Sequence, residues 1–310
     1  MVTVKEIESF KAYGKCVSIS NGKIEAMVTV DIGPRIIFFG FIGGQNFMCT
    51  DRVGLGGRTD ESYTKLFGEN KKWESLGGHR VWLSPESYPE TYTPDDKPVK
   101  YTATKDGAIF VSQDDIEIGV AKSLELKMSA DGNDMSITMN VKNIDEAPKT
   151  FSVWAISVCS ADGTLIIPLN TNDTDLLPNR SISVWPYTDM RDSRIYWGNK
   201  YITVRQDTSA KSPMKLGVDL NCGMACYVLG DEVFKKNYKT NHKISSYPDG
   251  GCSFETYTNN LMLEFETLSE LKTVNKGETH TLTELWSLCK KPCEVDFRDN
   301  DSIDNMIEKL

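Results

Sequence analysis

The run from Gly77 to Glu86, GGHRVWLSPE, brings together side chains that could perform acid–base chemistry. His79, one of three histidines in the chain, follows paired glycines and precedes an arginine, a tryptophan and a carboxylate. Histidine can take or give a proton near neutral pH, and glycines let a backbone approach a ligand closely. We therefore predict a ligand site in this run. The alternative interpretation is a structural histidine in a tight turn that opens a strand.

A second group of polar residues lies near the end of the chain. Glu264 and Glu266 alternate with Leu263 and Phe265 in a segment that is typical of a strand. Because side chains alternate between the two faces of a strand, the two carboxylates share one face. They could handle protons of a ligand or simply be solvated.

Most of the chain between these groups and around them is predicted to form strands. Asn21 with Gly22, and Asp106 with Gly107, mark hairpin turns, and the alternation in 124–128 and 135–141 predicts another hairpin. Further strands are expected over Cys16–Ser20, Lys23–Val30, Lys100–Thr104, Ala108–Ser112, Thr150–Cys159, Thr164–Pro168, Tyr201–Arg205, Lys215–Leu220, Met224–Leu229, Cys252–Thr258, Leu261–Thr267 and His280–Leu288. The many hairpins predict antiparallel sheets.

Helices are expected only at the two termini. Thr3 followed by Glu6 is typical of a capping box and predicts a short first helix. Apolar residues at positions 303, 306, 307 and 310 share one helical face and predict a helix that closes the chain.

Three long loops interrupt the strands, at Asp51–Ser75, Ser87–Pro98 and Leu169–Asn199. Loops of this length in a compact protein are usually functional or poorly ordered. The last is rich in Asn, Asp and Arg, and it carries four aromatic residues that suit a sugar, namely Trp185, Tyr187, Tyr196 and Trp197. We find no internal repeat or proline-rich linker, so residues 1–310 are expected to form one domain.

Composition limits the possible classes of function. The apolar, charged and aromatic fractions of 39%, 25% and 10% are typical of a soluble globular protein, and no apolar run is long enough to cross a membrane. No secretory signal is visible, which predicts a cytoplasmic location. The net charge of −9 disfavours nucleic acid as a partner.

The eight cysteines are expected to be reduced thiols in a cytoplasmic protein. Two pairs have a spacing that zinc could use, Cys222 with Cys226 and Cys289 with Cys293. The same spacing also arises when cysteines share one face of a strand, and we expect no metal and no cofactor.

Several motifs, taken in order, resemble the aldose 1-epimerase (galactose mutarotase) superfamily. The passage from Tyr247 to Leu288 is similar to its closing strands, and the GGHRVW run is similar to the segment that brings a histidine to the sugar. VDIGPRI and GGQN within Val30–Asn46 resemble its early strands, and NIDEAP at 143–148 resembles the step before its central strand.

This resemblance implies an all-β fold, a large antiparallel β-sandwich of the galactose mutarotase-like type, with the sugar bound across a concave sheet face. It implies a mutarotase, which opens a sugar hemiacetal and recloses it as the other anomer. A base removes the proton of the anomeric hydroxyl while an acid protonates the ring oxygen. By motif position, Glu266 is the expected base, and His79 is expected to contact or protonate the sugar.

The expected partner is thus a small sugar or sugar derivative. The residues expected to bind it are Arg35, Arg80, Trp82, Glu86, Trp154, Asp249, Glu255 and Tyr257. Trp154 stands near the position where the family usually has its general-acid histidine, so either His79 supplies the acid or turnover is weak or absent. His242 and His280, the other two histidines, are expected to be structural.

Other functions remain open at this point. A non-catalytic carbohydrate-binding protein on the same fold is favoured by Trp154, and a polyuronate lyase or another glycan-active enzyme is a further alternative. Arg35, Arg80 and Arg191 could select a phosphorylated sugar. The deciding observation is whether His79 and Glu266 face one pocket.

Overall fold

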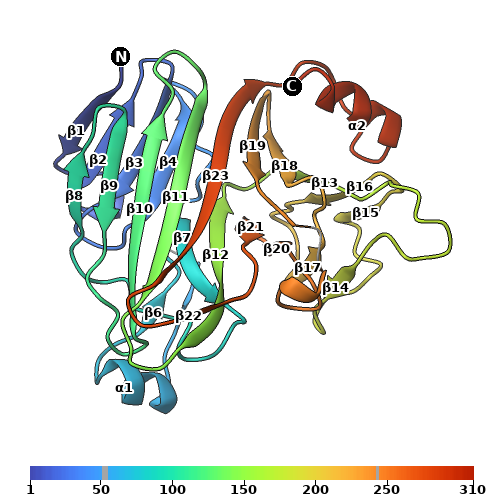
Figure 1. The fold of residues 1–310 in the computed structure, drawn as a ribbon. Coiled ribbons are helices and arrows are strands. Elements are labelled where there is room, and N and C mark those ends of the chain that lie inside the picture. Colours follow the sequence, from blue (N-terminus) through green and yellow to red (C-terminus); the bar gives the residue numbers. More distant parts are fainter. Residues whose placement is uncertain (51–54, 242–243) are drawn as a thin grey trace.

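Two large antiparallel sheets stack face to face in the computed structural model, which describes residues 1–50, 55–241 and 244–310 (Figure 1). The first sheet contains, in spatial order, β1 (Thr3–Ile7), β2 (Cys16–Ser20), β3 (Ile24–Thr29), β4 (Ile36–Phe41), β7 (Gly78–Ser84), β12 (Lys149–Cys159), β21 (Leu263–Leu268), β20 (Phe254–Thr258), β17 (Met214–Val218) and β14 (Ile182–Val184), with β22 (Lys272–Val274) paired to β12.

The second sheet contains, in spatial order, β15 (Ile195–Trp197), β16 (Tyr201–Arg205), β13 (Thr164–Pro168), β18 (Met224–Leu229), β19 (Glu232–Tyr238), β23 (Thr279–Lys290), β11 (Asp134–Asn143), β10 (Val120–Met128), β9 (Gly107–Val111) and β8 (Lys100–Ala103). A small third sheet pairs β5 (Gly57–Arg58) with β6 (Trp73–Glu74). The helical segments are α1 (Glu61–Phe67), α2 (Asn300–Ile307) and two short 3₁₀ turns, η1 (Lys11–Tyr13) and η2 (Ile244–Ser246).

The sandwich predicted from the sequence is confirmed, and the periodicity of the strands explains it. In the hairpin of β10 and β11, Leu124 pairs with Met139 and Leu126 with Ile137, and all four are buried between the sheets. The alternate positions face away from this core. Four predicted strands, at 16–20, 164–168, 201–205 and 224–229, coincide with β2, β13, β16 and β18.

The predicted helix at the N-terminus is wrong, whereas the one at the C-terminus is confirmed as α2. Residues 3–7 form β1, and the Thr3 hydroxyl donates to the Ser20 carbonyl of β2 at 3.1 Å instead of capping a helix. The β-branched residues of TVKEI suit a strand, and pairing with β2 supplies the backbone partners that a helix would have provided. The sandwich therefore has a terminal helix at one end only (Figure 1).

Several elements have no counterpart among the predictions, including β5, α1 and β6 in the loop expected at 51–75, β14 and β15 in the loop expected at 169–199, and β19. α1 lies within the long loop after residue 50 and begins at Asp60, whose side chain accepts from the Tyr63 N–H. β19 was not predicted, because two lysines interrupt its apolar residues. One of them, Lys236, is fully buried and paired with Glu284 at 3.2 Å. No helix in the described part of the chain is long and apolar enough to cross a bilayer.

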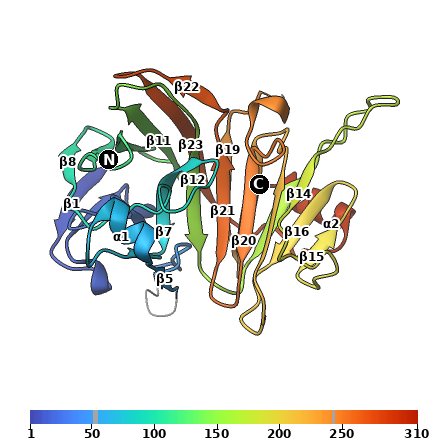
Figure 2. The ribbon, with the colours of Figure 1, turned by 90° about the horizontal axis from the view of Figure 1, so that it is seen from below.

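Five neighbouring strands of the first sheet, β7, β12, β21, β20 and β17, position the candidate site. Figure 2 shows β7, β12, β21 and β20 side by side, with α1 close to β7. One face of these strands packs into the core between the sheets. The opposite face, here called the outer face, carries a separate apolar cluster that includes Trp82, Trp154 and Ile156.

Candidate functional site

The registers of the five strands arrange the polar residues of the outer face in rows. Glu264 pairs with Tyr257, and Tyr257 pairs with Lys215 on the next strand. In the adjacent row, Glu266 pairs with Glu255. Because paired residues of neighbouring strands project to the same side of the sheet, the side chains of each row lie together on the outer face.

A pocket of about 400 Å³ opens on this face. It is lined by Leu55, Gly56, Gly57, Arg58, Trp73, Ser75, Arg80, Trp82, Glu86, Tyr92, Trp154, Ile156, Tyr187, Lys215, Tyr257, Asn259, Met262 and Glu264. Trp82 is the centre of its aromatic wall, with ring centroids 5.6 Å from Trp154, 5.8 Å from Trp73 and 4.9 Å from Tyr92. Flat aromatic faces beside hydrogen-bonding groups suit a sugar, which has both apolar and polar surfaces.

Arg80 and Glu264 form an ion pair at the edge of the pocket. Nη2 of Arg80 lies 3.0 Å from Oε1 of Glu264, and the guanidinium carbon lies 4.2 Å from the centre of the Trp82 ring. Arg80 is only 3% exposed, yet its Nε and Nη1 have no hydrogen-bond partner in the described part of the chain. A buried guanidinium with unmet donors is costly, so the pocket is suited to a ligand that accepts hydrogen bonds.

Lys215 forms the centre of a buried charge cluster on the floor of the pocket. Its Nζ lies 2.7 Å from Oε2 of Glu255 and 3.3 Å from Oε2 of Glu266, and the indole N–H of Trp154 donates to the same Glu266 oxygen at 2.8 Å. All four residues are buried. Glu266 does not line the pocket and lies behind Lys215 and Trp154.

Two carboxylates share one ammonium in this cluster, so they cannot both be ionised without leaving a buried negative charge unbalanced. Burial raises the pKa of Glu255 well above its ordinary value. Burial also raises the pKa of Glu266 to about 7, although Lys215 and the Trp154 hydrogen bond oppose this shift. For Lys215, burial alone would lower the pKa, but Glu266 and Glu255 outweigh it and raise the pKa. The cluster therefore holds an exchangeable proton near neutral pH.

The raised pKa of Glu266 predicts a specific pH dependence of stability. Between its ordinary value of about 4.5 and its folded value of about 7, the folded protein binds more protons than the unfolded chain. The free energy of unfolding should thus fall as the pH rises through this window, by roughly 3 kcal/mol from this group. Glu266→Gln should lack this part of the slope in chemical denaturation curves recorded from pH 4 to 8. Parallel pH profiles of the two proteins would contradict the assignment.

The prediction that His79 shares a pocket with Glu266 is wrong. His79 is fully buried on the core face of β7, where Nδ1 contacts the Ser157 hydroxyl at 2.9 Å and Nε2 contacts the Met139 sulfur at 3.3 Å. Its ring stands edge-on to Trp286 of the second sheet, with centroids 4.9 Å apart. Burial lowers the pKa of His79 well below its ordinary value. Adjacent residues of a strand face opposite sides, so Arg80 rather than His79 reaches the pocket.

The paired glycines before His79 also serve packing rather than a ligand. Gly77 and Gly78 have positive φ angles, and a Cβ at Gly78 would lie 2.6 Å from the carbonyl oxygen of Ile36 on β4. Glycine is required here because the backbones of β4 and β7 approach each other closely.

His79→Leu is expected to reduce stability and to leave ligand binding unchanged. The substitution removes the partner of the buried Ser157 hydroxyl, which should cost about 1–3 kcal/mol in the free energy of unfolding. Denaturant unfolding measures that loss, and titration with any sugar that binds the wild type should give an affinity within about twofold. A large loss of affinity in a folded variant would indicate that His79 takes part in ligand binding.

Arg35 and Asp249, also expected at the sugar, belong neither to the pocket lining nor to the charge cluster behind it. Arg35 is fully buried, with Nη2 2.8 Å from Oδ2 of Asp95 and Nη1 donating to the Gly77 carbonyl at 3.1 Å. These bonds tie the segments before and after β7 to the residue that precedes β4, which is a structural role. Asp249 is exposed and accepts a hydrogen bond from Ser84 at 3.3 Å.

The other expected residues lie in or directly behind the pocket. Arg80, Trp82, Glu86, Trp154 and Tyr257 line it, and Glu86 accepts a hydrogen bond from the Tyr92 hydroxyl. Glu255 and Glu266 belong to the cluster behind them.

The aromatic loop is divided between two places. Tyr187 lines the pocket and lies 6.4 Å from the Tyr257 ring, and the Trp185 ring centre lies 4.8 Å from Nζ of Lys215. Tyr196 and Trp197 belong to β15 and are absent from the pocket lining, and the Trp197 N–H donates to the Met190 carbonyl.

Sequence reasoning missed Lys215, Arg58, Trp73, Tyr92 and Asn259 as pocket residues. Lys215 could have been found from the sequence. It begins a predicted apolar strand, and alternation places its side chain on the same face as every second residue after it. Arg58 and Trp73 belong to the small sheet of β5 and β6, and no pattern indicates which strand that sheet covers.

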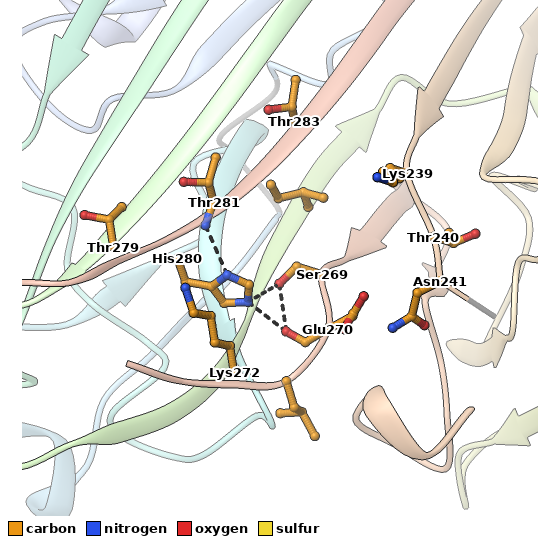
Figure 3. Close-up of a pocket in the computed structure, with 12 residues that line it drawn as sticks. Lys239, Thr240, Asn241, Ser269, Glu270, Lys272, Thr279, His280, Thr281 and Thr283 are labelled. Atoms are coloured by element: carbon orange, nitrogen blue, oxygen red, sulfur yellow. Dashed lines mark hydrogen bonds between the residues drawn. The ribbon is translucent and has the colours of Figure 1, made fainter. Parts of the chain in front are cut away.

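A larger cleft, of about 640 Å³, lies elsewhere, between the end of β19, β22 and the start of β23 (Figure 3). His280 faces this cleft, but its Nε2 contacts the Ser269 hydroxyl at 2.9 Å and the Glu270 carbonyl at 2.7 Å, and its Nδ1 accepts from the Thr281 N–H. These contacts agree with a structural histidine. None of the predicted site residues lines this cleft, and His242 lies outside the described residues.

The cysteines pack mainly with apolar residues. Cys226, Cys289 and Cys293 contact the cluster that contains Ile303 and Met306 of α2. Among the residues that the structure describes, no three His, Cys, Asp or Glu side chains are grouped so that they could hold a metal ion.

Comparison with known proteins identifies the architecture. A scan against sequence models of protein families finds no match, and neither does a search of curated proteins. Solved structures do match: a galactose mutarotase-like protein from Lactobacillus casei, with 11% identity and a TM-score of 0.54, aligns over 88% of this chain and 100% of its own. A galactose mutarotase-like protein from Clostridium acetobutylicum, with 11% identity and a TM-score of 0.55, aligns over 93% of this chain and 99% of its own. The chain therefore has the fold of galactose mutarotase-like proteins.

Proposed function

We propose that the outer-face pocket binds a sugar ring and that the protein is an aldose 1-epimerase-like isomerase. The observation that carries this proposal is the row of Glu264, Tyr257 and Lys215 across three neighbouring strands. The two charged residues stand two strand spacings apart, about 10 Å between Cα atoms, so their side chains flank the space above Tyr257. A carboxylate and an ammonium on two sides of a sugar-sized pocket meet the need for a proton acceptor and a proton donor.

Each group has a defined part in the proposed reaction. Glu264 takes the proton of the anomeric hydroxyl, the bond between the anomeric carbon and the ring oxygen breaks, and Lys215 gives a proton to that oxygen. Lys215 regains a proton from Glu266, whose Oε2 lies 3.3 Å from Nζ. After the aldehyde rotates, the same steps run in reverse and close the ring as the other anomer. Glu266 thus remains in the proton path, but as the donor to Lys215.

A second candidate function is sugar binding without turnover. It is favoured by the position of His79 in the core and by Trp154, whose indole stands between the pocket and Glu266. In this case the aromatic wall and Arg80 would hold the sugar, and no group would move its protons at a useful rate.

NMR exchange spectroscopy at equilibrium separates the two functions. Each pyranose of a panel of neutral and acidic sugars is mixed with the protein, and the exchange between its α and β anomeric signals is measured. Isomerase activity predicts faster exchange for at least one sugar than in protein-free buffer. Binding by saturation-transfer difference without faster exchange would support the second candidate, and neither signal across the panel would refute both.

A further inference from the structure

We propose that the sugar bound in this pocket carries a carboxylate, as a hexuronate does. The inference rests on the proposed function, because it names the class of sugar that the same pocket would take. Its basis is an excess of hydrogen-bond donors on the pocket wall.

Several buried donors of the pocket residues have no hydrogen-bond partner among the residues that the structure describes. They are Nε and Nη1 of Arg80 and the indole N–H groups of Trp82 and Trp73. All three residues line the pocket, and Arg80 and Trp82 are 3% and 4% exposed. Buried donors in folded proteins are almost always satisfied, so several unpartnered donors on residues of one pocket indicate a missing acceptor.

The two carboxylates of the wall each accept one hydrogen bond from the protein. Glu264 accepts from Arg80, and Glu86 accepts from the Tyr92 hydroxyl. The unpartnered oxygens of Glu255 and Glu266 belong to residues that do not line the pocket. The described lining thus carries three cationic side chains, those of Arg58, Arg80 and Lys215, against the two carboxylates of Glu86 and Glu264.

A carboxylate matches this wall better than a hydroxyl or a phosphate. An ionised carboxylate only accepts hydrogen bonds, whereas a hydroxyl also brings a proton that needs an acceptor. Arg80 is held over the Trp82 ring, and a planar guanidinium suits the planar carboxylate. Arg58 also lines the pocket but is exposed, so Arg80 is the only buried guanidinium among the described lining residues, which suits a monoanion rather than a phosphate dianion.

Isothermal titration at pH 7 and low salt tests the inference with glucose, galactose, glucuronate, galacturonate and glucose 6-phosphate. We expect a hexuronate to bind at least about tenfold more tightly than the matching neutral hexose. Trp82→Phe removes the indole donor and keeps an aromatic ring. Arg80→Lys keeps the positive charge but replaces the planar guanidinium with an ammonium group. Each should weaken hexuronate binding about three- to tenfold and neutral-hexose binding less than twofold. Arg205→Gln, a change to an exposed arginine paired with Asp207 outside the pocket lining, is the matched control and should alter neither.

The outcomes separate this inference from the function on which it rests. Equal affinity for neutral and acidic hexoses would overturn the inference and leave sugar binding intact. Tighter binding of glucose 6-phosphate than of either hexuronate would mean that the pocket prefers a phosphate, and this would also overturn the inference. No binding of any of the five sugars would overturn both proposals. Circular dichroism checks the fold of Trp82→Phe. If this folded variant loses its preference for hexuronates over neutral hexoses, the result supports the inference even if Arg80→Lys fails to fold.

Discussion

Glu264→Gln is expected to slow anomer exchange by about 10²- to 10⁴-fold, the usual contribution of a positioned acid–base group. The amide cannot take the anomeric proton, but its oxygen can still accept the hydrogen bond that Arg80 now gives to Oε1 at 3.0 Å. The variant should therefore fold and bind sugar with an affinity close to that of the wild type. Exchange NMR measures the rate, and titration of the same sample measures the affinity.

Glu270→Gln is a matched control, since it changes a glutamate in the separate cleft of Figure 3 and should leave the exchange rate unchanged. Full activity in Glu264→Gln together with inactivity in Glu266→Gln would restore Glu266 as the base, as the family resemblance implies. Full activity in both variants would mean that neither glutamate of β21 takes part in the reaction.

His79 and Arg80 are adjacent in the sequence, but only Arg80 lines the pocket, and the sequence alone does not predict which of the two does so. The unusual composition of Gly77–Glu86 correctly indicates a strand of the candidate site. It could not decide which of two adjacent polar residues faces the pocket, because β7 lies in the middle of a sheet that is buried on both sides. Alternation shows that the two residues point apart, and only the packing of the second sheet against His79 determines which side is the core.

The cluster around Lys215 could not be predicted for a different reason. Its three charged members come from β17, β20 and β21, and their contact depends on the register Gly217 with Glu255 and Glu255 with Glu266. The sequence indicates each strand by its alternation. Register is set by the whole sheet, since a shift by one residue would move every side chain to the other face.

Lys215→Met is expected to cause the largest loss of stability, about 3–5 kcal/mol at pH 7.5, because it leaves Glu255 and Glu266 buried without their ammonium. The loss should shrink as the pH falls toward about 5, because a buried carboxyl that takes up a proton no longer needs a positive partner. Denaturant unfolding at several pH values measures both effects.

The double variant Lys215→Met/Glu255→Gln should recover most of the lost stability, because a single buried carboxyl can remain protonated where two cannot share a site easily. Lys200→Met, which removes a half-exposed lysine paired with Asp304, is the matched control and should cost at most about 1 kcal/mol. Equal losses in Lys215→Met and Lys200→Met would mean that both buried glutamates are already neutral. The raised pKa of Lys215, which depends on ionised carboxylates beside it, would then have no source.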